Sequence, residues 1–137
     1  LACLHLHALA PHKALIAPGA AAWPMWSVYG VADGLIEAQI GMRAEHLRPR
    51  DQRSQSYLVK QTERIERCFE HLQARLAVFE DGLNLASITV GIACGYQIWR
   101  DWLTDFRPCY PALAAWYENF AQRDAMRATE PRETPER

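Results

Sequence analysis

Hydrophobic residues recur along this chain with the spacing of helices, and no segment alternates as a strand does. A long helix is predicted from about residue 20 to residue 47. Pro24 is tolerated in its first turn, and Pro49 ends it because the residue before a proline is pushed out of helical geometry. A second helix is predicted over 51–79, where charged residues face away from an apolar stripe that repeats every seven residues: Leu58, Ile65, Leu72 and Phe79.

A third helix is predicted to begin after the turn Glu80-Asp81-Gly82 and to run to about Trp99. Asn84 is suited to cap it by accepting a hydrogen bond from a backbone N–H, and Ser87 stands at its third position. The run from residue 82 to residue 99 has no charge, but it contains several polar residues and glycines. A helix buried inside a soluble protein is therefore expected rather than a membrane span.

The remaining segments complete an all-α domain. Pro111 is suited to start a helix whose core-facing stripe is Leu113, Trp116, Tyr117 and Phe120, and a short helix is predicted over Asp124–Ala128. We predict a helical bundle of four to five main helices over 20–129. Residues 1–19 are expected to be the end of a preceding helix and a linker, and 130–137 a frayed tail.

Composition narrows the class of protein. The chain has 137 residues, enough for one domain, and its 15 Lys and Arg balance 16 Asp and Glu, so nucleic acid and anionic membranes are poor candidates as partners. The four cysteines include no CxxC pair. We therefore expect free thiols in a reducing cytosol and no metal site. The first ten residues lack the basic leader of a signal peptide.

Candidate chemistry is sparse. The sequence has no glycine-rich phosphate loop, no GxSxG and no HExxH, and no residue can be assigned a catalytic role. One acidic pattern stands out, because Asp33, Glu37, Gly41 and Ala44 fall on one face of the first long helix. This face is either an exposed acidic stripe, which the spacing alone favours, or a binding surface with a groove beside the small residues.

An ordered set of motifs resembles the C-terminal domain of cytosolic glutathione transferases, especially the bacterial ones. The set covers nearly the whole chain and consists of 32–38 (ADGLIEA), 42–45 (MRAE) with Arg48-Pro49, 83–88 (LNLASI), 110–117 (YPALAAWY) with 121–123 (AQR), and 128–131 (ATEP). Residues 2–10 resemble the end of the last helix of that family's thioredoxin-like N-terminal domain. That domain carries most contacts to glutathione and the thiol-activating residue, and neither is expected in this chain.

The resemblance implies a function and site residues. Asp33 matches an aspartate that contacts the ammonium of glutathione across a homodimer interface, and Glu37, Gly41 and Ala44 match positions that line the pocket for a hydrophobic electrophile. Glutathione is the implied co-substrate, attacking the electrophile as a thiolate in the cytoplasm. Ser87 replaces the family's usual aspartate, so the return bond of the cap is expected to be weak or missing.

Two other hypotheses remain open. Helical domains of this type also occur as non-catalytic scaffolds for protein interaction, and the chain could be a degenerate fragment without activity. A thioredoxin-like βαβ pattern encoded upstream of Leu1 would favour the enzyme, and a different domain there would favour the scaffold.

Overall fold

The computed structural model describes residues 2–9 and 15–132, and these contain helices and no strand. The helices are α1 (Ala2–Leu9), α2 (Trp23–His46), α3 (Gln55–Ala74), α4 (Leu85–Trp99), α5 (Pro111–Phe120) and α6 (Asp124–Ala128), with 3-10 turns at Gly19–Ala22, Arg50–Gln52 and Leu76–Val78. The all-α bundle predicted from the sequence is confirmed. Part of the expected frayed tail, 133–137, lies outside the described residues.

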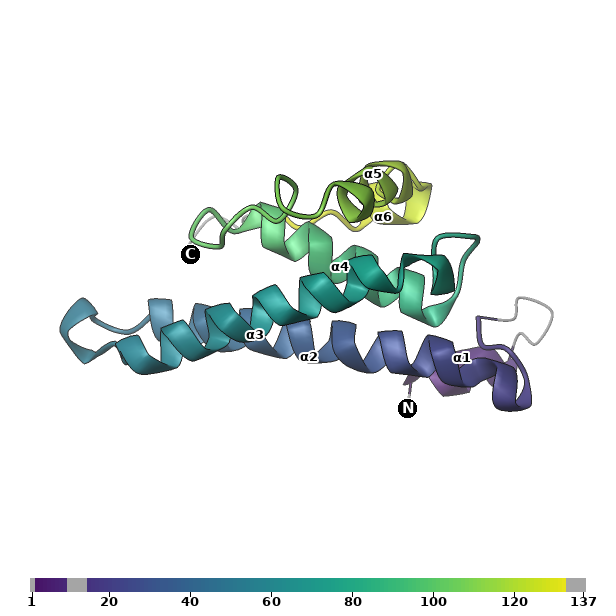
Figure 1. Cartoon of the computed structure of the whole chain (residues 1–137), viewed down its shortest axis with the longest axis horizontal. Coiled ribbons are helices and arrows are strands. Elements are labelled where there is room, and N and C mark those ends of the chain that lie inside the picture. Colours follow the sequence, from purple (N-terminus) through teal and green to yellow (C-terminus); the bar gives the residue numbers. More distant parts are fainter. Residues whose placement is uncertain (1, 10–14, 133–137) are drawn as a thin grey trace.

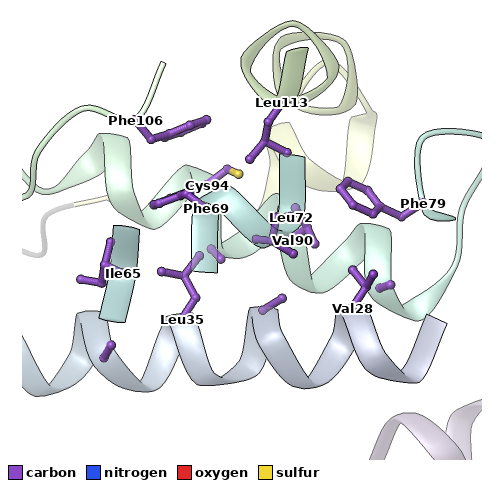
Figure 2. Packing of buried hydrophobic residues seen from close by; sticks show 14 of the residues in the cluster. Val28, Leu35, Ile65, Phe69, Leu72, Phe79, Val90, Cys94, Phe106 and Leu113 are labelled. Carbon is purple, nitrogen blue, oxygen red and sulfur yellow. The ribbon is translucent and has the colours of Figure 1, made fainter. Parts of the chain in front are cut away.

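Helices α2 and α3 run side by side along the long axis of the molecule, α4 lies across them, and α5 and α6 cover the far side of α4 (Figure 1). The core forms where α2, α3 and α4 meet. Figure 2 shows Leu35 of α2, Phe69 of α3 and Cys94 of α4 in the same cluster, and all three are almost completely buried. This burial removes apolar surface from water, which is the main favourable term in folding.

The predicted boundaries of the first two long helices are too wide. The first is preceded by a 3-10 turn and begins at Trp23, and the second begins only at Gln55, where the Ser54 side chain accepts a hydrogen bond from the Tyr57 backbone N–H at 3.3 Å. Helix α3 ends at Ala74 and is followed by the 3-10 turn Leu76–Val78. Phe79, which comes after this turn, is still fully buried. The hydrophobic repeat therefore located the core-facing residues correctly but did not show where helical hydrogen bonding ends.

Polar contacts hold the connection between α2 and α3. The buried carboxylate of Glu45 accepts a hydrogen bond from the Ser54 backbone N–H, so the end of one helix is tied to the cap of the next. The guanidinium of Arg53 donates to the His46 and Arg48 carbonyls, which lie at the end of α2 and just after it. These contacts satisfy carbonyls that the end of a helix leaves without partners.

The uncharged segment 82–99 forms the buried helix that was expected. Within residues 2–9 and 15–132, no helix combines the length and the apolar character needed to cross a bilayer. The linker is anchored to the start of α4, because the Leu85 backbone N–H donates to the Leu15 carbonyl at 3.0 Å.

Candidate functional site

The acidic face of α2 is exposed, and its two carboxylates have different surroundings. Glu37 accepts a hydrogen bond from the Arg64 guanidinium of α3 at 3.2 Å. Asp33 is exposed and has no ion-pair partner among the described residues. It lies one turn from Tyr29, whose pKa is raised by burial and further by the charges of Asp33 and Cys3. Asp33 is therefore the carboxylate on this face that is free to bind a cation.

The groove expected beside the small residues is filled by side chains of α3. A Cβ atom built on Gly34 would stand 3.0 Å from a guanidinium nitrogen of Arg64, and one built on Gly41 would collide with the Tyr57 hydroxyl. Ala44 is exposed. Three cavities in the described part of the chain are lined by other residues, and none of them by Asp33, Glu37, Gly41 or Ala44. The space beside Gly34 and Gly41 is thus occupied by Arg64 and Tyr57, and the sequence of α2 could not show which α3 side chains lie opposite.

The cap of α4 is a reciprocal pair of hydrogen bonds. The Asn84 side-chain oxygen accepts from the Ser87 backbone N–H at 2.9 Å, and the Ser87 hydroxyl oxygen accepts from the Asn84 backbone N–H at 2.9 Å. The expectation of a weak or missing return bond is therefore wrong: the serine hydroxyl reaches the N–H that the family's aspartate would bind. Both residues thus fix the start of α4.

A cavity of about 460 Å³ lies between α3 and the segment that joins α4 to α5. Apolar residues form its floor, including Met42, Ile65, Phe69 and Phe106, while Glu63, Glu66 and Glu70 stand along its rim. Sequence reasoning missed this site. The spacing of residues places its glutamates on the charged face of α3, away from the apolar stripe. No local pattern shows that the segment after α4 folds over them.

A second cavity, of about 570 Å³, lies between α4 and the C-terminal segment from α5 to Pro131. The aromatic residues Tyr96, Trp99 and Tyr117 line it, and Ile92 and Ile98 expose large apolar side chains along the same face of α4.

All four cysteines are free thiols, as predicted: Cys3, Cys68, Cys94 and Cys109. Cys94 is fully buried, and burial raises the pKa of its thiol far above the ordinary value. Burial also raises the pKa of Cys68, although Arg64 and Arg67 act in the opposite direction. These two thiols therefore do not have the depressed pKa of a nucleophilic cysteine. Within the described ranges, no three His, Cys, Asp or Glu side chains converge as metal ligands.

The chain is similar in sequence to a protein described as glutathione-transferase-like. It is 32% identical over 111 residues to the uncharacterized GST-like protein YibF of Escherichia coli K12, an alignment that covers 76% of this chain and 53% of that protein. The chain thus spans about half the length of this curated relative. No protein-family model matches the sequence.

Solved structures give the same fold. A glutathione transferase family member from Pseudomonas fluorescens Pf-5, crystallised with bound S-(propanoic acid)-glutathione, is 32% identical with a TM-score of 0.83, and the match covers 88% of this chain and 63% of that one. A glutathione S-transferase from Methylobacterium radiotolerans in complex with glutathione sulfonate matches 98% of this chain and 67% of its own, with a TM-score of 0.87 at 22% identity. In its sequence and its fold, the chain is a homologue of glutathione-transferase-like proteins, and it has an all-helical domain of the kind found at their C-terminal end.

Proposed function

We propose that this chain is the electrophile-binding and dimer-forming half of a protein that conjugates the thiolate of glutathione to hydrophobic electrophiles. Residues 20–129 are the helical domain in this proposal, and 1–19 the end of a thioredoxin-like domain with its linker. The free cysteines are in keeping with a cytoplasmic protein. The relative from P. fluorescens was crystallised with bound glutathione, which supports the same ligand here.

The observation that carries the proposal is the carboxylate of Asp33. It is exposed on α2 and unpaired among the described residues, whereas Glu37 one turn later is held by Arg64. A charge-assisted bond from an ammonium to a carboxylate is stronger than a neutral hydrogen bond, so Asp33 is suited to bind the ammonium of glutathione held by the opposite subunit of a homodimer.

The electrophile pocket is a less direct part of the proposal. Glu37, Gly41 and Ala44 would form one wall of it, and a second wall would come from the domain that holds glutathione. Because Tyr57 lies against Gly41 and Arg64 binds Glu37, these two side chains of α3 would also contact the electrophile or restrict its size.

Titration calorimetry of glutathione into the complete dimeric protein tests the role of Asp33. The Asp33→Asn variant keeps the size of the side chain and removes its charge. We expect it to weaken binding by roughly 1–3 kcal/mol, or about five- to 150-fold in the dissociation constant.

Glu37→Gln is the matched control, since it removes a charge one turn away that already has a partner, and glutathione affinity should then change by less than about 0.5 kcal/mol. Equal dissociation constants for the wild type and Asp33→Asn would leave Asp33 as a solvated surface residue. Lack of any glutathione binding by the complete wild-type protein would instead favour the alternative of a non-catalytic interaction module with the same fold.

A further inference from the structure

The cavity between α3 and the segment from Arg100 to Tyr110 is not used by the proposed function. Its 460 Å³ falls within the range of small-molecule sites in proteins. The segment is held onto α3, because the Tyr110 hydroxyl donates to the Glu66 backbone carbonyl at 3.1 Å. The cavity therefore lies between two elements that are joined by a hydrogen bond.

Aromatic rings make up much of the cavity wall. Phe69 and Phe106 stack with their centroids 4.7 Å apart and their planes 5° from parallel, and Phe69 also stacks on Tyr110 at 5.7 Å. Both phenylalanines are almost completely buried, whereas Tyr110 is partly exposed. The two buried rings hold Tyr110 in place, so its partly exposed ring is the aromatic surface open to a flat apolar ligand.

The rim carries negative charge that the protein does not neutralise. Glu63 lies 4.0 Å from Arg67, and Asp105 is held by Arg107 at 2.8 Å. Glu66 and Glu70, one turn apart on α3, have no ion-pair partner in the part of the chain that the structure describes. Like charges at this spacing repel each other, so a cation bound between them would relieve that repulsion.

The same two glutamates act on the phenol of Tyr110. Burial raises its pKa most, and the charges of Cys109, Glu66 and Glu70 raise it further. The two carboxylates therefore lie close to the Tyr110 ring, whose face can itself attract a cation.

We propose that this cavity binds a small organic cation, an aromatic ring joined to an ammonium group. The ligand ring lies against the partly exposed ring of Tyr110, which is supported by the stacked rings of Phe69 and Phe106, and the ammonium lies between the carboxylates of Glu66 and Glu70. Apolar burial and charge together define the ligand class, because a neutral aromatic molecule would leave the carboxylates unpaired and an inorganic cation would leave the apolar wall uncovered.

Tryptamine is a suitable probe, with indole-3-propionate as the analogue of similar shape and opposite charge. Calorimetric titration of the 137-residue chain should show that tryptamine binds and that the propionate does not. The Glu66→Gln/Glu70→Gln variant should weaken tryptamine binding by roughly tenfold or more, as expected for the loss of charged partners. A Glu80→Gln/Asp81→Asn variant makes the same change in net charge outside the cavity and should bind tryptamine like the wild type.

Cys109 provides a second readout, because it is exposed and lines the cavity. Bound tryptamine should slow its alkylation by iodoacetamide, as followed by peptide mass spectrometry, and should leave the alkylation of exposed Cys3 on α1 unchanged. The proposal is overturned if tryptamine does not bind at millimolar concentration, if cation and anion bind equally, or if the two double variants have the same affinity.

Discussion

The side-chain amide of Gln39 donates to the side-chain oxygen of Gln97 at 2.7 Å inside the core, although the two residues are 58 positions apart. The same amide donates to the Ala93 carbonyl at 3.0 Å, and the amide of Gln97 donates to the Thr104 carbonyl at 2.8 Å. Both glutamines are almost completely buried. This chain of hydrogen bonds ties α2 to α4 and to the segment that closes the cavity over α3.

Replacing either glutamine by leucine should destabilise the domain by roughly 1–3 kcal/mol, because the partner is left buried without its hydrogen bond. The double variant Gln39→Leu/Gln97→Leu should cost less than the sum of the two single changes, with a coupling energy of about 0.5–3 kcal/mol. Urea unfolding of all four proteins measures this cycle. Additive single effects would show that the two amides do not act as a pair.

The reciprocal cap of α4 should contribute measurably to stability. We expect Asn84→Ala to lower the free energy of unfolding by about 0.5–2 kcal/mol, because the Ser87 backbone N–H loses its acceptor. Asn119→Ala is a matched control: Asn119 is exposed within α5, and among the described residues its side chain donates only to the Ala115 carbonyl of its own helix. Alanine has the higher helix propensity, so this control should not destabilise. If both variants unfolded at the same denaturant concentration, the cap would have no special role.

Two glycines should respond in opposite ways to substitution by alanine. A Cβ atom on Gly91 would stand 2.6 Å from a ring carbon of Phe120, so Gly91→Ala should destabilise by roughly 1–3 kcal/mol through overpacking. A Cβ atom on Gly30 has nothing within 4 Å, and Gly30→Ala should stabilise by about 0.5–1 kcal/mol through helix propensity. Thermal and urea unfolding compare the pair. A stabilising Gly91→Ala would mean that Phe120 moves aside without cost.

Burial of Cys94 should make stability depend on pH under alkaline conditions. Its folded pKa is raised above the ordinary 9.0, so the unfolded chain loses this proton first as the pH rises. The contribution of this thiol is therefore fully present below about pH 9 and declines above it, by at most about 1.4 kcal/mol per pH unit. Cys94→Ala should remove part of this slope in urea unfolding between pH 8 and pH 10, even though it lowers stability at neutral pH. A slope unchanged by the substitution would contradict this assignment.

Local signals in the sequence were enough for the fold class. Helical spacing of apolar residues located the core positions Ile65, Leu72 and Phe79, which are buried in the structure. Prolines and the cap at Asn84 located helix ends, because their effects act on the neighbouring backbone alone. The same local reasoning missed the break in helical hydrogen bonding after Ala74, where a 3-10 turn still directs Phe79 into the core.

The candidate sites depend on residues that meet only in the tertiary structure. The sequence by itself put Asp33 and Glu37 on one face of a helix, since their spacing fixes that. Only the packing of α3 against α2 decided that Arg64 binds Glu37 and that the Tyr57 hydroxyl lies against Gly41, while Asp33 has no ion-pair partner within 2–9 and 15–132. The acidic cavity likewise required the segment after α4 to fold back onto α3. Helix periodicity determines which way a side chain faces, but its partner is set by long-range packing that no local pattern encodes.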